Sequence, residues 1–205
     1  FLAKEWAHPS DNIGTSLSYF MSNGGSFKEF SESIVRTYEI QGSLSVGTSL
    51  NKEGYDHVFF VKIASGAIYA SLLSKGNEEI IRRTINNILL DGPTLRAYRH
   101  APNVGKRKSW AAGDATSRAV RLAMITLSGE MGYPGVLSAP VWGFEDVSFK
   151  GEKLKLPQPF STYVMENILF KISFPAEFHA QTAVEAAVTL HPEIKDRLDD
   201  IKNIQ

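Results

Sequence analysis

The stretch that most constrains the fold is VFFVKIASGAIYASLL, residues 58–73, because it is apolar on almost every side. An amphipathic helix buries a single stripe, whereas a helix that is apolar all round has to be surrounded by other elements. The turn before it, NKEGYD, ends at Asp56, which can cap a helix that begins at His57. We therefore expect this helix at the centre of a helical bundle.

Other segments with helical spacing precede and follow this stretch. Ser26-Phe27-Lys28-Glu29 is a capping-box pattern that opens a helix, and small residues dominate from Gly42 to Leu50, where we still favour helix. The remaining predicted helices cover residues 12–21, 78–90, 114–127, 163–172, 176–189 and 192–204. FKGEKLKL alternates apolar and charged residues, so an exposed two-stranded piece is expected within residues 147–156. The predicted fold class is all-α.

Composition excludes several classes of protein. Lys plus Arg and Asp plus Glu are balanced at 22 each, which argues against a nucleic-acid-binding protein. The chain has no cysteine, so disulfides, thiolate nucleophiles and Cys-ligated metal sites are excluded within it. The apolar runs are too short to span a bilayer. Because the sequence opens at Phe1 and stops at Gln205 inside a helical pattern, we expect it to be a piece of something longer.

A cationic loop precedes the helix expected from residue 114. Its hydrogen-bond donors are Arg96, Arg99, His100, Asn103, Lys106, Arg107, Lys108 and Ser109. Such donors beside a helix N-terminus suit a bound anion. A solvated surface run is the alternative, but Trp110 and two alanines follow at once and tether the loop to something buried. We favour the anion site.

Four histidines lie in contexts that fit either chemistry or structure. His8 precedes a proline, His57 opens a helix, His100 lies in the cationic loop, and His179 lies in a predicted helix. For His8 and His57, capping or filling is about as well supported as catalysis. No HExxH or similar spacing occurs, and cationic neighbours disfavour a metal, so we expect no metal site. Lys171, in ILFKISF, either extends to solvent or serves as the cation of a site.

Beyond these short patterns, nearly the whole chain resembles the MmgE/PrpD family. The resemblance rests on RHAPNVGKRKSWAAGDATSRAVRLA, GEMGYP, APVWGF, DVSFKGE and YVMENILFKISFPAEFHAQTAVEAA, with EWAHPSDN, YEIQG and DHVFFVKIAS before them. Members of this family resemble one another in having a large all-α domain and a smaller lid domain. The resemblance implies that residues 1–205 are part of the helical domain, a single domain truncated at both ends, with the lid absent.

The resemblance also implies an activity, the dehydration of 2-methylcitrate to 2-methyl-cis-aconitate in the methylcitrate cycle of propionate catabolism, without a cofactor. By similarity to the proposed active site of the related cis-aconitate decarboxylase, the catalytic residues would be His8, His57, Lys108 and Lys171. Arg99, His100, Arg107 and Lys108 would bind the tricarboxylate. Expected partners are this small molecule and a second copy of the chain, for which residues 58–73 and 168–174 offer apolar surface. The expected location is the mitochondrial matrix in a eukaryote and otherwise the cytoplasm.

The residues themselves suit this chemistry. Dehydration of a β-hydroxy tricarboxylate removes a C–H proton next to a carboxylate and protonates the departing hydroxyl, and imidazoles can do both near neutral pH. Lysines and arginines can bind the three carboxylates. The sequence does not assign which histidine is the acid. Two alternatives stay open: a decarboxylase or isomerase of the same family, and a non-catalytic helical module.

Overall fold

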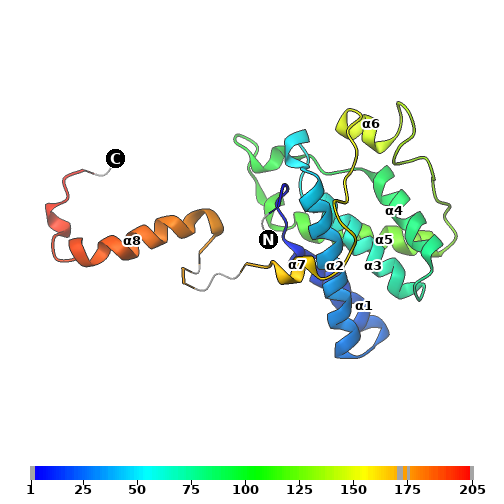
Figure 1. Ribbon diagram of the computed structural model, residues 1–205, viewed down its shortest axis with the longest axis horizontal. Helices are drawn as coiled ribbons and strands as arrows, with labels where there is room; N and C mark the ends of the chain where they lie inside the picture. The colour runs from blue at the N-terminus through cyan, green and yellow to red at the C-terminus, as the bar shows by residue number, and fades with distance from the viewer. Residues whose placement is uncertain (1–2, 170–172, 175, 204–205) are drawn as a thin grey trace. The chain divides into compact units, whose positions relative to one another are not determined.

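The computed structural model describes residues 3–169, 173–174 and 176–203, and no β-strand occurs among them, which confirms the all-α prediction. The helices are α1 (Ile13–Asn23), α2 (Phe27–Gly47), α3 (Val58–Leu73), α4 (Glu78–Asp91), α5 (Ala111–Leu127), α6 (Phe144–Phe149), α7 (Tyr163–Glu166) and α8 (Gln181–Ile194) (Figure 1). Short 3-10 helices include η1 (Pro9–Asn12), η3 (Arg96–Arg99) and η4 (Lys106–Ser109). The chain divides into two compact units, residues 1–168 and 169–205.

Helix α3 is the central element of the first unit. It packs against α1, α2, α4 and α5, which surround it in Figure 1. Every residue from Val58 to Ala70 is buried, as its uniformly apolar sequence predicts. The same burial corrects most of one expectation, because residues 58–70 are enclosed by their own unit and only residues 71–73, which are half-buried, keep surface that a second copy could contact.

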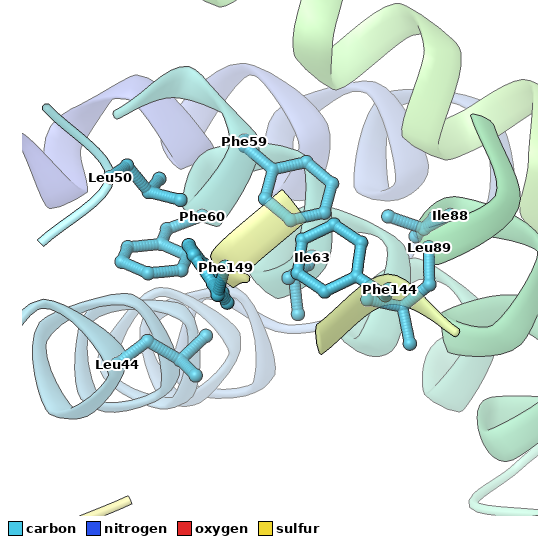
Figure 2. Packing of buried hydrophobic residues seen from close by; sticks show 9 residues of the cluster. All are labelled: Leu44, Leu50, Phe59, Phe60, Ile63, Ile88, Leu89, Phe144 and Phe149. Carbon is cyan, nitrogen blue, oxygen red and sulfur yellow. The ribbon is translucent and has the colours of Figure 1, made fainter. Parts of the chain in front are cut away.

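The largest hydrophobic cluster joins α3 to three other helices (Figure 2). Leu44 comes from α2, Ile88 from α4 and Phe144 from α6, and all three pack around the aromatic residues of α3. The ring of Phe59 stacks on that of Phe144 with centroids 5.2 Å apart. Because each fully buried side chain of this size contributes about 1.5–3 kcal/mol, this cluster fixes the position of α3 and with it the loop that precedes it.

The small residues of α2 allow another segment to approach closely. The helix continues to Gly47, which confirms the helical prediction for most of this stretch. A Cβ at Gly42 would lie 2.3 Å from Cγ2 of Val164, so only glycine lets α7 pack at this distance. The buried carboxylate of Glu39 accepts hydrogen bonds from the backbone N–H groups of Ser161 and Val164, at 3.0 and 2.9 Å. These contacts secure α7 against α2.

The predicted two-stranded piece at residues 147–156 is wrong. Its first residues belong to α6, and Lys150 then takes a left-handed conformation with φ of 54°. The N–H groups of Gly151 and Glu152 then donate to carbonyls of α6, and those of Leu154 and Lys155 donate to the side chains of Glu145 and Thr48, so none of these four pairs with a strand. Helix α5 also begins at Ala111, three residues before the predicted start.

The predicted boundaries are also wrong near the C-terminus. Helix α7 ends at Glu166, short of residue 172, and Lys171 lies outside the described residues. Helix α8 runs through Pro192, where a break between two helices was expected, and within the described residues up to 203 it is followed by a 3-10 turn, Leu198–Asp200. Pro192 lies in the last turn of α8, where its missing N–H removes a single helical hydrogen bond. Among the described residues, no helix combines the length and apolar character needed to cross a membrane.

Candidate active site

The structure brings two of the predicted catalytic residues together. His8 immediately precedes η1 and His57 immediately precedes α3, and their rings meet edge to face with centroids 5.2 Å apart. His57 is buried, with 4% of its side chain exposed, whereas His8 is partly exposed to solvent. The pair therefore joins one imidazole inside the protein to one that solvent can reach.

A buried polar network holds the turn that carries His8. The side-chain amide of Asn12 donates to the carbonyl of Pro9 at 3.0 Å and to Oε1 of Gln41 at 2.5 Å. Ser65 of α3 donates to Oδ1 of Asn12 at 2.8 Å, and Thr15 of α1 donates to Ser65 at 3.0 Å. Because all these side chains are buried and bonded, the network fixes η1 against α1, α2 and α3.

Asp56 is fully buried and is the charged centre of the site. Arg99 donates to both of its oxygens, through Nε to Oδ2 and through Nη2 to Oδ1, the latter at 3.2 Å. Nη1 of Arg96 lies 3.6 Å from Oδ2, and the backbone N–H of Val58 donates to Oδ1 at 3.2 Å. The helix begins at Val58 with His57 as its N-cap residue, one position later than predicted, so Asp56 is not the cap residue but still accepts from the first N–H of α3. Asp56 also neutralises part of the cationic loop.

A short backbone contact explains how η3 reaches Asp56. Tyr55 and Leu95 form an isolated antiparallel bridge. On its two sides, Asp56 N–H donates to the carbonyl of Thr94 at 2.8 Å and Arg96 N–H donates to the carbonyl of Gly54 at 2.9 Å. The bridge aligns the start of the cationic loop with the start of α3.

His57 lies between two carboxylates. Its Nδ1 is 3.2 Å from Oδ1 of Asp56, and its Nε2 is 3.7 Å from Oδ2 of Asp11 in η1. Nδ1 is buried and has no aligned hydrogen bond among the described residues, so its contact with Asp56 is mainly electrostatic. An imidazolium at this position would face opposite charge on both sides.

Burial and local charge together shift the pKa values of His8 and Asp56. Loss of solvent at its ring and then repulsion from His57 lower the pKa of His8 below its ordinary 6.5, against the opposing effect of Asp11. Burial alone would raise the pKa of Asp56. The hydrogen bonds from Arg99 and the charge of His57 outweigh burial and lower it below 3.8. Asp56 therefore stays ionised, and neutral His8 is favoured near pH 7.

The remaining predicted binding residues lie apart from this pair. Nη2 of Arg107 donates to Asp114 at 3.1 Å, and its guanidinium lies over the rings of Trp110 and Tyr98, with 4.4 and 5.5 Å to the centroids. His100 and Lys108 are exposed, and no described contact joins their side chains to either histidine. Much of the charge of the loop is thus already compensated by Asp56 and Asp114.

Sequence reasoning missed the acidic partners of the site. Asp56 was expected only as a helix cap and residue 114 only as a helix start, and no role at the site was expected for Asp11. Each of these carboxylates precedes or opens a helix, so capping and ion pairing leave the same signal in the sequence. Among the described residues, no three His, Cys, Asp or Glu side chains are arranged to hold a metal ion.

The fold and the site together define an all-α domain with a histidine pair beside a loop of paired arginines. Comparison with known proteins is more specific. The MmgE/PrpD N-terminal domain matches residues 1–157 and the MmgE/PrpD C-terminal domain matches residues 174–205. The chain belongs to the MmgE/PrpD family. The prediction that all 205 residues form one truncated helical domain stays a prediction.

Several relatives are similar over almost the whole chain. 2-Methylcitrate dehydratase from Escherichia coli K12 is 52% identical to this chain over an alignment 205 residues long. The alignment covers 95% of this chain and 42% of that protein. The Cupriavidus necator protein of the same name is 52% identical over an alignment 201 residues long, which covers 93% of this chain and 41% of that protein. The mitochondrial 2-methylcitrate dehydratase of Yarrowia lipolytica is 48% identical over an alignment 219 residues long, which covers 100% of this chain and 42% of that protein. The chain therefore spans well under half the length of these relatives.

Proposed function

We propose that the complete protein dehydrates 2-methylcitrate to 2-methyl-cis-aconitate. The observation that carries this proposal is the His8–His57 pair, which places two imidazoles with centroids 5.2 Å apart beside a cationic loop. The names of the relatives supply the substrate, since they are 2-methylcitrate dehydratases at about 50% identity. The chemistry requires one proton acceptor and one proton donor, and this pair supplies both.

We assign the base to His8 and the acid to His57. The pKa of His8 lies below 6.5, so the neutral form that accepts a proton dominates near pH 7. His57 lies between Asp11 and Asp56, whose charges compensate the imidazolium that donates a proton to the departing hydroxyl. In this step the C–H electron pair forms the double bond, the C–O bond breaks, and the hydroxyl leaves as water.

We assign the carboxylate contacts to the exposed cations of the loop. Lys108 and His100 are exposed and can turn toward a substrate, whereas Arg99 and Arg107 already hold Asp56 and Asp114. The two arginines would therefore contribute with the guanidinium nitrogens that their partners leave open. Lys171 is proposed as a further cation on the basis of the family resemblance. No cofactor is needed for this scheme.

The proposal is tested with the complete parent protein. After EDTA treatment it is mixed with 2-methylcitrate, and absorbance of the conjugated double bond is followed. His8→Ala and His57→Ala are each expected to lower kcat by about 10²–10⁴-fold, the range for general acid–base catalysis. His191→Ala, in exposed α8, is the matched control and should keep its activity.

Isotope exchange separates the two roles. In D₂O the base alone can exchange the substrate C–H proton, so His57→Ala should retain exchange and His8→Ala should lose it. Turnover of both variants within a fewfold of wild type would exclude the histidine assignment. Activity on cis-aconitate in place of 2-methylcitrate would indicate the decarboxylase alternative, and metal-dependent recovery after EDTA would exclude the cofactor-free mechanism.

We also propose that the complete protein is a homodimer, in the mitochondrial matrix if the source is a eukaryote and otherwise in the cytoplasm. The family resemblance supports the homodimer. The name of the Yarrowia lipolytica relative, which includes the word mitochondrial, supports the location in a eukaryote. Light scattering on the complete protein would test the first claim, and a monomer mass would exclude it. Cell fractionation would test the second.

A further inference from the structure

The acid–base assignment leaves the role of Asp56 open, although this carboxylate lies directly against His57. Its Oδ1 is 3.2 Å from Nδ1 of His57, on the buried side of the imidazole. The opposite nitrogen, Nε2, faces η1, where Asp11 lies 3.7 Å away. The ring therefore has one nitrogen turned to a fixed internal charge and the other turned to the turn that carries His8.

We propose that Asp56 is a positioning residue for His57, holding Nδ1 inward so that the proton exchanged with substrate is carried on Nε2. The inference rests on the proposed function, because it gives His57 the role of acid. It adds a residue that never needs to touch the substrate. Arg99 and the N–H of Val58 hold Asp56 in turn, so the carboxylate is itself rigidly placed.

The surroundings of His57 leave Asp56 as the charge that orients its inner nitrogen. From η1 and the residue before it come Asp11 and His8, both on the outer side or at the ring edge. From η3 come Arg96 and Arg99, which act on Asp56 and would repel an imidazolium if Asp56 were neutral. Solvent cannot replace Asp56, because Nδ1 is buried. A neutral amide would leave both guanidinium groups without their counter-charge.

The test compares Asp56→Asn with Asp91→Asn in the complete protein. Asp91 is the matched control, since it also pairs with a buried cation, accepting from Nζ of Lys62 at 2.6 Å, and lies outside the site. Asp56→Asn should lower kcat for 2-methylcitrate by about 10–100-fold, the effect typical of a lost orienting partner, with KM nearly unchanged. Asp91→Asn should keep both constants while losing stability.

A double-mutant cycle shows whether the effect passes through His57. If it does, adding Asp56→Asn to His57→Asn should change the residual turnover by less than about twofold, because the group to be oriented is already gone. A full additional loss in the His57→Asn background would overturn the proposal. So would a raised KM with unchanged kcat, which would indicate that Asp56 acts on the substrate through Arg99.

A spectroscopic measurement keeps the inference separate from the proposed function. With ¹⁵N-labelled histidine, the wild-type protein should show His57 with its proton on Nδ1 when neutral, and Asp56→Asn should shift the signals toward the other tautomer. Unchanged His57 signals in Asp56→Asn would overturn the positioning role. If wild type made no product from 2-methylcitrate, the proposed function would fail, and the tautomer result would still decide the role of Asp56.

Discussion

His8 links the charge of the candidate site to the stability of the protein. Its pKa is lower in the folded protein than the ordinary 6.5, so between these two values the unfolded chain binds more protons. Stability therefore falls as the pH drops below 6.5, through the folded pKa of His8. In His8→Gln this part of the acid loss should disappear.

Urea unfolding of wild type and His8→Gln at about pH 7.5 and about pH 5 measures this difference, through the change in free energy of unfolding between the two conditions. His191→Gln, which changes an exposed histidine of α8, serves as the control and should behave like wild type. An equal acid loss in wild type and His8→Gln would contradict the prediction.

At this scale the sequence identified the two histidines but not their geometry. A proline after His8 and a helix start at His57 are local signals, and both residues do meet. The ion pair of Asp56 with Arg99 spans 43 positions, and no local pattern indicates which carboxylate a given arginine will reach. Arg107 lies only seven positions from Asp114, and their pairing was missed for another reason: a donor beside a helix start suits a bound anion as well as a carboxylate of the helix itself.

At the scale of elements, the approach of α7 to α2 depends on a single missing side chain. Gly42→Ala would place a Cβ 2.3 Å from Val164, a fully buried side chain that cannot move away without cost. We expect the variant to lose about 1–3 kcal/mol in the free energy of unfolding, as overpacked sites do. Chemical denaturation measures this loss.

Gly14→Ala is the matched control for this substitution. Gly14 also lies in a helix, α1, but nothing lies within 4 Å of its Cβ position. Alanine there should stabilise the protein by about 0.4–1 kcal/mol, because it restricts the unfolded chain without a clash. If the two alanine variants were equally stable, close packing of α7 would not be the reason for glycine at position 42.

Helices with a strong periodic or uniform pattern were predictable, and extended segments were not. The apolar sequence of α3 demanded burial whatever its neighbours, and the capping box of Ser26 and Glu29 forms as its pattern predicts. The alternation of apolar and charged residues within 147–156 indicates only that this segment has one apolar and one charged side. A strand also needs a partner, and here side chains of Thr48 and Glu145 take the backbone donors instead.

At the scale of the whole molecule, the described hydrophobic clusters all lie in the unit of residues 1–168. A chain ending at Ile168 should therefore unfold cooperatively, with a midpoint within about 4 °C of the 205-residue chain. Circular dichroism during heating measures both midpoints. Loss of cooperative unfolding on removal of residues 169–205 would show that the first unit depends on them.

A shorter chain ending at Pro157 is the informative comparison for that truncation. It lacks Val164 and the N–H groups that bind Glu39, a residue that is 3% exposed in the intact structure. Water can solvate the uncovered carboxylate, so the expected loss comes from the missing packing of Val164 and the two missing hydrogen bonds, and the midpoint should fall clearly below that of the chain ending at Ile168. Equal midpoints for the two truncated chains would contradict this account of α7.

The span between Asp56 and Arg99 also has a consequence for biosynthesis. Both histidines leave the ribosome before the arginine that neutralises Asp56, which follows that carboxylate by 43 positions. At ~5–20 residues per second, roughly two to nine seconds separate their synthesis. During that interval the nascent chain carries its two imidazoles without the ion pair that sets their surroundings. The histidine pair proposed for acid–base chemistry therefore gains its charged surroundings only after the cationic loop has been synthesised.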